Sequence, residues 1–167
     1  MRSNSNVCIA MNAGFARGSC LCGAVSFRAS LPPKWVAHCH CSYCRRAHGA
    51  PFVTWAGFGT KQFNVDAEAV QPAWYESSPG ARRGFCPRCG SPMLFESTRW
   101  PGETHVARAL FHDPLNREPS AHVFYESHVS WLNVNDDLPK KVSQGSPDQS
   151  PPPEFPQSGT STEAGNA

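Results

Sequence analysis

Hydrophobic and polar residues alternate over short stretches of this chain, a pattern typical of half-buried β-strands. The clearest case is the run in which Val25, Phe27 and Ala29 alternate with Ser26 and Arg28. Short aromatic and β-branched runs predict further strands, and these runs are 51–58, 93–95, 105–111 and 121–126. Pro or Gly separates nearly all of them, which favours short strands joined by tight turns. We therefore expect an all-β domain.

The two ends of the chain differ from its centre. Residues 1–16 have neither strand nor helix periodicity and are expected to form a loose leader. Residues 143–167 are almost entirely Ser, Pro, Gly, Gln, Thr and Glu, and such a segment buries too little apolar surface to offset the entropy of ordering it. We expect a disordered tail there, a folded domain over 17–142, and within that domain a single short helix around 42–48.

Composition and charge exclude several classes of protein. The chain has a net charge of +2, and residues 1–142 carry all 15 basic residues but only 10 of the 13 acidic ones, which gives that part +5 (15 − 10). This charge is too modest for a nucleic-acid-binding arm but is compatible with an anionic small ligand. No apolar run approaches the roughly 18 residues of a membrane span. The one candidate signal sequence, 7–11, ends at Asn12, so we expect a cytoplasmic protein with reduced cysteines and neither a nucleic-acid nor a membrane partner.

Seven of the eight cysteines fall into three tight groups. The groups are Cys20-Leu21-Cys22, Cys39-His40-Cys41-Ser42-Tyr43-Cys44 and Cys86-Pro87-Arg88-Cys89. Thiolates two or three positions apart on a tight turn can bind one tetrahedral metal ion, whereas a disulfide within so short a group would be strained. The groups therefore predict zinc binding. Cys8 lies in the expected leader and is interpreted as a bystander thiol.

The third group is the strongest single signal because 85–90 has the form of a zinc knuckle. A strand leads in, Pro87 fixes a turn, and Gly90 can adopt positive φ after the second ligand. A knuckle supplies two ligands and needs a partner pair. The Cys20–Cys22 pair, also followed by a glycine, would complete a closed four-thiolate site of structural type. An alternative division combines that pair with two of the thiols in 39–44 and leaves the knuckle without a partner.

In the first division, Cys39, Cys41 and Cys44 remain as three thiolates on one segment. Three protein ligands and one open position are the arrangement of a catalytic zinc, which accepts water or an exogenous thiol. His40 lies between two of these ligands and is an alternative ligand, although an intervening residue usually points the other way. Arg45 directly follows the last ligand, so we expect it to hold a substrate carboxylate beside the metal.

The cysteine-bearing stretches resemble the glutathione-dependent formaldehyde-activating (GFA) family, also described as the centromere protein V/GFA domain. The resemblance covers residues 17–139 and rests on three ordered motifs, 18–25, 39–50 and 85–92, with a weaker match from 111 to 131. It implies a β-tent fold of small antiparallel sheets stapled by two zinc ions. It also implies the first division, with a structural ion on Cys20, Cys22, Cys86 and Cys89 and a catalytic ion on Cys39, Cys41 and Cys44.

The activity implied by the resemblance is that of a carbon–sulfur lyase, which condenses formaldehyde with glutathione to S-(hydroxymethyl)glutathione and reverses that reaction. A zinc ion with an open position can bind the thiol sulfur or polarise the aldehyde oxygen. Two positions depart from the family pattern. His112 replaces an acidic residue in the stretch 111–114, and Val129-Ser130 stands before Trp131 in place of an Ala-Pro or similar pair. Both departures bear on the pocket lining, so the identity of the thiol and of the aldehyde does not follow from the resemblance.

A second function class is a noncatalytic zinc-stapled binding module of the centromere protein V type. Such a module needs only the closed four-thiolate site, whereas the presence of Cys39, Cys41 and Cys44 together favours chemistry. The sequence therefore predicts a zinc-dependent lyase that acts on a small thiol–aldehyde adduct, with the binding module as the alternative.

Overall fold

The computed structural model describes residues 14–143, which form ten strands, one α-helix and three 3₁₀ turns. The strands are β1 (Phe15–Ser19), β2 (Ser26–Ser30), β3 (Trp35–Cys39), β4 (Val53–Gly59), β5 (Phe63–Val65), β6 (Ala73–Ser78), β7 (Ala81–Phe85), β8 (Pro92–Ser97), β9 (Glu103–Ala107) and β10 (His122–Val123). The helix is α1 (Ser42–His48), and the 3₁₀ turns are η1 (Thr60–Gln62), η2 (Arg108–Leu110) and η3 (Tyr125–Ser127). The β character and the short helix around 42–48 are confirmed.

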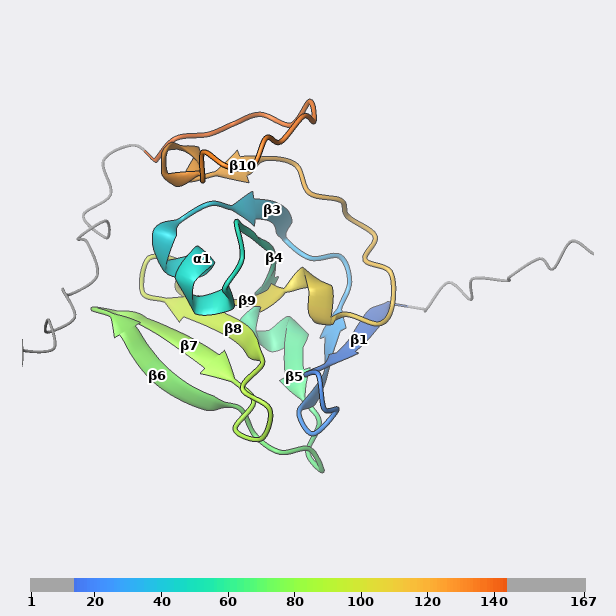
Figure 1. The fold of residues 1–167 in the computed structure, drawn as a ribbon. Coiled ribbons are helices and arrows are strands. Elements are labelled where there is room, and N and C mark those ends of the chain that lie inside the picture. The colour runs from blue at the N-terminus through green and yellow to red at the C-terminus, as the bar shows by residue number, and fades with distance from the viewer. Residues whose placement is uncertain (1–13, 144–167) are drawn as a thin grey trace, which may run out of the picture.

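The strands form two sheets, and α1 lies across one face of the larger sheet (Figure 1). The smaller sheet has the order β1-β2-β5 and is antiparallel throughout. The larger sheet has the order β10-β3-β4-β9-β8-β7-β6. Its neighbours pair antiparallel except for β10, which runs parallel to β3. The second sheet is thus larger than the small antiparallel sheets we expected, and it is mixed.

The main hydrophobic core combines side chains from both sheets. β1 and β2 contribute from the smaller sheet, and β3, β4, β8 and β9 contribute from the larger one. The core members on these strands are Ala16, Phe27, Ala29, Val36, Ala56, Phe58, Met93, Leu94 and Val106. Cys20 and Cys86 belong to the same core and are 2% and 0% exposed. Two cysteines of the predicted four-thiolate site are therefore held inside the packed interior.

A second cluster lies on the opposite face of the larger sheet. Successive residues of a strand point to opposite faces, so Val36 of β3 packs into the main core while Trp35 and Cys39 pack into the second cluster. Cys44 of α1 and Trp55 of β4 complete its centre. The alternation along β3 thus presents the middle cysteine group to this face.

Gly57 on β4 allows Trp35 to lie flat on this face. The two residues are paired in register, and a Cβ at Gly57 would lie 2.3 Å from Cε2 of the indole. The indole nitrogen Nε1 of Trp35 donates to the Glu103 carboxylate at 3.0 Å. Glycine is therefore required at 57 by close approach of the ring, which is fixed at both its face and its nitrogen.

The expected domain limits can be compared with the described residues. β1 begins at Phe15, two residues inside the segment expected to be a leader. Most of that leader, with Cys8, and the expected tail beyond Ser143 lie outside the described residues. Within 14–143, no helix has the length and hydrophobicity needed to cross a lipid bilayer.

Candidate metal centre and adjoining cavity

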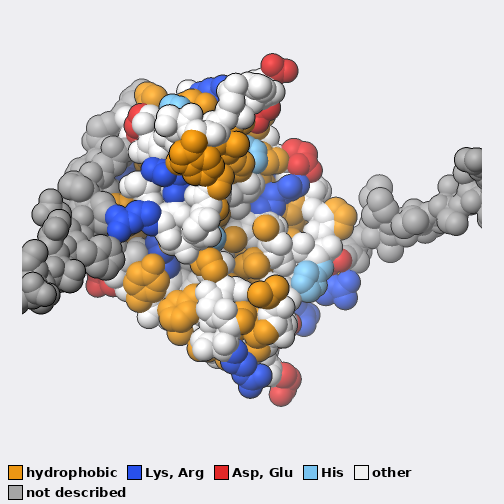
Figure 2. Space-filling model, in the orientation of Figure 1, with side chains coloured by type: hydrophobic (Ala, Val, Ile, Leu, Met, Phe, Trp, Pro, Cys, Tyr) orange, Lys and Arg blue, Asp and Glu red, His pale blue; other side chains and the backbone are white. Residues whose placement is uncertain are grey.

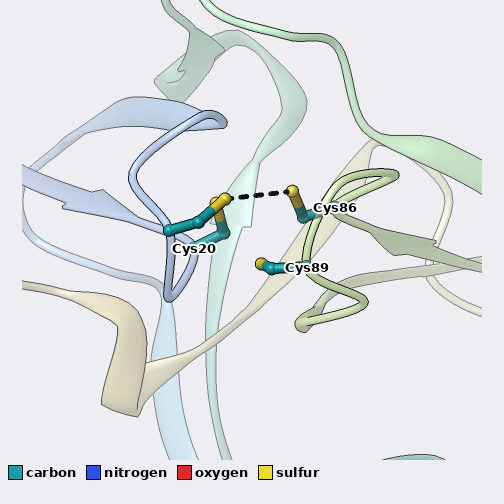
Figure 3. Close-up of side chains that lie close together, drawn as sticks. Cys20, Cys86 and Cys89 are labelled. Atoms are coloured by element: carbon teal, nitrogen blue, oxygen red, sulfur yellow. Dashed lines mark hydrogen bonds between the residues drawn. The ribbon is translucent and has the colours of Figure 1, made fainter.

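Cys20, Cys22, Cys86 and Cys89 come together from the turn after β1 and the turn after β7. Their sulfur atoms all lie within 4.8 Å of one another. The Cys20 and Cys22 sulfurs are 3.6 Å apart, and the Cys22 and Cys86 sulfurs are 3.9 Å apart. Figure 3 shows the labelled side chains of Cys20, Cys86 and Cys89 pointing into the space between the two turns. The first and third cysteine groups are therefore neighbours.

The two turns share two features, a glycine after the second cysteine and a backbone hydrogen bond to the first cysteine. In each turn a glycine at positive φ follows the second cysteine, with φ of 75° at Gly23 and 74° at Gly90. The N–H of Gly23 donates to the carbonyl of Cys20 at 3.0 Å, and the N–H of Gly90 donates to the carbonyl of Cys86 at 2.9 Å. Each turn thus folds its two sulfurs to the same side. This is the knuckle geometry predicted from Pro87 and Gly90.

Hydrogen bonds favour the thiolate form at two of these sulfurs, those of Cys20 and Cys89. The N–H of Val25 donates to Cys20 Sγ at 3.3 Å. The Ser91 hydroxyl lies 3.1 Å from Cys89 Sγ, and this contact is the main cause that lowers the pKa of Cys89 to about 5. Four clustered thiol ligands with N–H and O–H donors beside them fit a closed tetrahedral zinc site. The cluster is consistent with one metal site.

Cys39, Cys41 and Cys44 lie at the end of β3 and on the first turn of α1. Cys39 and Cys44 are buried, and Cys41 is half-buried. Interaction with Cys39, and then with Cys44, lowers the pKa of the Cys41 thiol to about 2, whereas the contact with Cys41 is the main cause that raises the pKa of Cys39. The three sulfurs therefore act as one electrostatic unit that favours a thiolate at Cys41.

A cavity of about 320 Å³ opens beside these three thiols, and all three line it. Its walls come from β3, β4, β6, β7, β8 and β9, from the turn between β8 and β9, from α1, and from the segment around β10. Most of the wall is apolar, and its aromatic members include Trp35, Trp55, Phe95, Trp100 and Phe124. Its cationic members are Arg83, Arg99 and Lys141. Figure 2 shows hydrophobic side chains beside Lys and Arg side chains on the face seen in Figure 1.

Arg83 is a cationic residue of the cavity wall that lies within hydrogen-bonding distance of one of the thiols. It is only 7% exposed, and its Nη2 lies 3.7 Å from Cys44 Sγ. Its guanidinium stacks over the Phe95 ring at 4.8 Å from the centroid, and Nη1 has no hydrogen-bond partner among residues 14–143. A buried guanidinium with an unused donor at a cavity wall can receive a carboxylate or stabilise a thiolate.

Arg83 was not predicted from the sequence, because Arg82-Arg83 reads as a pair on a solvated face. The neighbouring Arg82 does behave in that way and pairs with Glu96 on the surface. The signal that could identify Arg83 is its position directly after Arg82 in one strand, since successive residues of a strand point to opposite faces. The strand itself carries too few apolar residues to be recognised.

Arg45 and His40 take different positions from the three thiols. Arg45 Nε donates to the backbone carbonyl of His40 at 3.1 Å, which ties α1 to the turn that precedes it. Arg45 is not among the residues that line the cavity. His40 is 1% exposed and its Nε2 lies 2.8 Å from Nδ1 of His122. Its ring is therefore engaged on the face of β3 away from the cavity.

Comparison with known proteins relates this arrangement to one family. Residues 15–127 match the family model described as glutathione-dependent formaldehyde-activating enzyme. A Halomonas elongata protein provisionally named as such an enzyme is 31% identical over 141 residues, which are 80% of this chain and 89% of that protein. A Schizosaccharomyces pombe protein described as an uncharacterised lyase is 33% identical over 94 residues, which are 56% of this chain and 66% of that protein.

A solved structure gives the same relation at the level of the fold. The crystal structure of a Rhodobacter sphaeroides protein matches this chain with a TM-score of 0.50 and 26% sequence identity, and the match covers 60% of this chain and 91% of that one. The family match spans both the clustered cysteine turns and the segment with the three cavity thiols. The chain therefore belongs to the glutathione-dependent formaldehyde-activating enzyme family.

Proposed function

We propose that this protein is a zinc-dependent carbon–sulfur lyase that forms and cleaves a thiol–aldehyde adduct, similar to an S-(hydroxymethyl)glutathione synthase. The observation that carries the proposal is the convergence of Cys39, Cys41, Cys44 and Arg83 on one cavity of about 320 Å³. This volume is in the range of small-molecule sites, and an aromatic wall with a few placed polar groups is their usual lining.

In this proposal two zinc ions staple a β-tent fold. Cys20, Cys22, Cys86 and Cys89 hold the structural ion, and Cys39, Cys41 and Cys44 hold the catalytic one. Bound zinc supplies a Lewis acid with one open position, which favours the thiolate form of an incoming thiol. The clustered sulfurs of the first site, and the position of the other three thiols together on the wall of one cavity, support this division.

The reaction balances without any oxidant or reductant. The substrate thiol loses its proton, the thiolate sulfur attacks the aldehyde carbon, and a carbon–sulfur bond forms. The electron pair of the carbonyl π bond moves to oxygen, which takes up a proton to give the hydroxymethyl thioether. The reverse reaction breaks the same carbon–sulfur bond and returns the thiol and the aldehyde.

The protein groups have separate parts in this scheme. Arg83 holds negative charge at the cavity wall, either the substrate sulfur or a carboxylate of a small peptide thiol. Arg45 holds the turn that carries the thiols through its bond to the His40 carbonyl. The aromatic wall excludes water from the adduct, which otherwise forms and decays spontaneously.

The direct test measures formaldehyde-dependent consumption of glutathione by zinc-loaded protein, above the spontaneous rate. Wild-type protein should accelerate the reaction, and Cys41→Ser should not, although its circular dichroism spectrum and its structural zinc should be retained. Equal rates with wild type, Cys41→Ser and buffer would favour the noncatalytic binding module of the centromere protein V type. The same assay with other thiols and aldehydes would identify the substrates, which we expect to be small molecules.

A further inference from the structure

We propose that His38, His122 and Asp136 form a third metal site, separate from both cysteine clusters, which binds a divalent transition cation such as Zn²⁺. Each of the three residues offers one ligand atom, and these atoms lie within 4.8 Å of one another. Two imidazoles and one carboxylate are a donor set that such cations take in proteins.

The backbone places the two imidazoles side by side. β10 pairs parallel with β3 so that His122 lies opposite His38, and β3 pairs with β4 so that His38 lies opposite Thr54. In-register residues of neighbouring strands project from the same face of a sheet. The two histidine rings accordingly lie 4.8 Å apart between centroids, with 30° between their planes. Because His38 precedes Cys39 on β3, this pair faces away from the thiol-lined cavity.

A polar partner fixes one nitrogen of each ring. Nδ1 of His38 lies 2.8 Å from Thr54 Oγ1, and Nδ1 of His122 lies 2.8 Å from Nε2 of His40. In metal sites the second ring nitrogen of a histidine ligand is held in this way, which sets the tautomer and the ring orientation. These contacts use Nδ1 of both rings, so the nitrogens that would bind the metal ion are Nε2 of His38 and Nε2 of His122, the latter beside Asp136.

Asp136 supplies a negatively charged carboxylate beside the two histidine rings. Both of its carboxylate oxygens lie 3.0 Å from Nε2 of His122. His122 is fully buried, and the Asp136 side chain is 41% exposed, so the site has a protein side and a solvent side. A cation from solution can therefore reach the site without unfolding the sheet.

A cation there would join three segments of the chain. The segment that carries Asp136 runs alongside β10, where the N–H of His122 donates to the Pro139 carbonyl at 2.9 Å and the N–H of Lys141 donates to the His122 carbonyl at 2.8 Å. Lys141 and Val123 line the cavity on the other face. Metal bound by β3, β10 and this segment would thus fix one wall of the cavity from behind.

The test uses tag-free, full-length protein whose cysteine clusters already hold zinc. Further Zn²⁺ is titrated into this protein and its binding is measured by calorimetry. We expect one additional site in the wild type and in the control Asp137→Asn, an exposed neighbour that is outside the cluster. Asp136→Asn should weaken this site about tenfold or more, since it removes a charged ligand. It keeps a carbonyl oxygen that can accept the His122 N–H, so its melting temperature without added metal should stay close to that of the wild type.

Loading with Co²⁺ separates this site from the cysteine clusters. Thiolate ligands give intense sulfur-to-metal charge-transfer absorption, whereas imidazole and carboxylate ligands do not. The last equivalent of Co²⁺ should therefore bind without further charge-transfer absorption, and this equivalent should be lost in Asp136→Asn. The proposal is overturned if no additional site appears, if every bound equivalent adds charge-transfer absorption, or if Asp136→Asn and Asp137→Asn bind equally. In each of those cases Asp136 only accepts a hydrogen bond from His122.

Discussion

Arg83 and Arg82 are adjacent in the sequence but have opposite environments. Arg82 pairs with Glu96 at the surface and lies over the Trp74 ring, 4.4 Å from its centroid. Arg83 is buried between Phe95 and the thiol of Cys44. Because a buried guanidinium is costly without a partner, the unused Nη1 at the cavity wall points to an anionic ligand as its partner.

The first prediction concerns this residue. Arg83→Gln should raise the KM for the thiol by about 10- to 100-fold, the equivalent of one hydrogen bond to a charged group, with a smaller effect on kcat. Arg45→Ala is the matched control, since Arg45 is absent from the cavity lining and should change KM much less. Steady-state kinetics with varied thiol check this. If the two substitutions raised KM equally, Arg45 would have to be considered again as the residue that binds the substrate carboxylate.

The second prediction concerns His105, which is 4% exposed on the cavity wall. Burial lowers the pKa of this imidazole from 6.5 to about 4. Because the folded state disfavours the charged ring, the stability that His105 contributes is complete above about pH 6.5 and is lost as the pH falls through 6.5 towards 4, with a loss of about 2 kcal/mol by pH 5.

Replacement of His105 isolates this contribution. His105→Gln should lose less free energy of unfolding between pH 7 and pH 5 than the wild type, whatever its stability at pH 7. Urea unfolding at both pH values measures the difference, and thiolate protonation cancels because it occurs in both proteins. An unchanged pH dependence would mean that the ring is already charged in the folded protein, through Glu103 at 3.4 Å.

At the level of secondary-structure elements, the sequence predicts the strands and helices whose hydrophobic pattern or end signal lies within the element itself. Val25, Phe27 and Ala29 identify β2, and Gly49, with φ of 58°, ends α1 where the helix was expected to end. The run 105–111 predicts a strand, but β9 covers only its first half and η2 follows. β3 was not predicted because it packs on both of its faces and therefore does not alternate.

The cavity is the part of the site that the sequence does not reveal. The three cysteine groups are visible because ligands within a group are close in sequence. Three distant parts of the chain reach the cavity, with Arg83 on β7, Trp100 in the turn between β8 and β9, and Lys141 in the segment after η3. Only the three-dimensional arrangement of the larger sheet and its connections brings them together. Contacts between residues so far apart in the sequence leave no periodic pattern along the chain from which they could be predicted.

The third prediction compares the two cysteine segments. Cys86→Ser should unfold the domain or cost several kcal/mol, on the order of its whole stability, because a closed zinc site contributes directly to folding. The Cys41→Ser protein should remain folded and lose only one metal equivalent, because the ligands of that metal ion all lie on one short segment and do not join distant parts of the fold. Circular dichroism with elemental analysis checks both. A folded Cys86→Ser protein with two zinc ions would contradict the proposed division.

At the scale of the whole molecule, the fourth prediction is two tightly held zinc ions of unequal stability. A chelator should first remove the ion on Cys39, Cys41 and Cys44, with loss of activity and little loss of structure. Removal of the second ion should coincide with unfolding. Chelator titration followed by metal analysis, activity and circular dichroism would show the two steps. Simultaneous loss of both ions would contradict the assignment of one as structural.

The fifth prediction concerns the end of the chain. Ser143 donates its N–H to the Glu126 carboxylate at 3.2 Å, so a truncation should be made after it. Residues 144–167 contain Phe155 as their one large apolar residue, which gives them little surface to bury. Their removal should shift the melting temperature by no more than a few degrees. A larger fall would indicate that this segment docks on the domain, with Phe155→Ala as the variant that tests the contact.

The separation of 64 residues between Cys22 and Cys86 has a consequence for biosynthesis. A growing chain exposes Cys20, Cys22 and the three thiols of 39–44 long before the second knuckle leaves the ribosome. During that interval Cys20 and Cys22 lack the two ligands of the second knuckle, whereas the three thiols of 39–44 are already complete as a set. An ion captured early between the Cys20–Cys22 pair and thiols of 39–44 would have to exchange ligands once Cys86 and Cys89 emerge. The yield of native protein should therefore depend on when zinc is supplied during synthesis, and not only on how much.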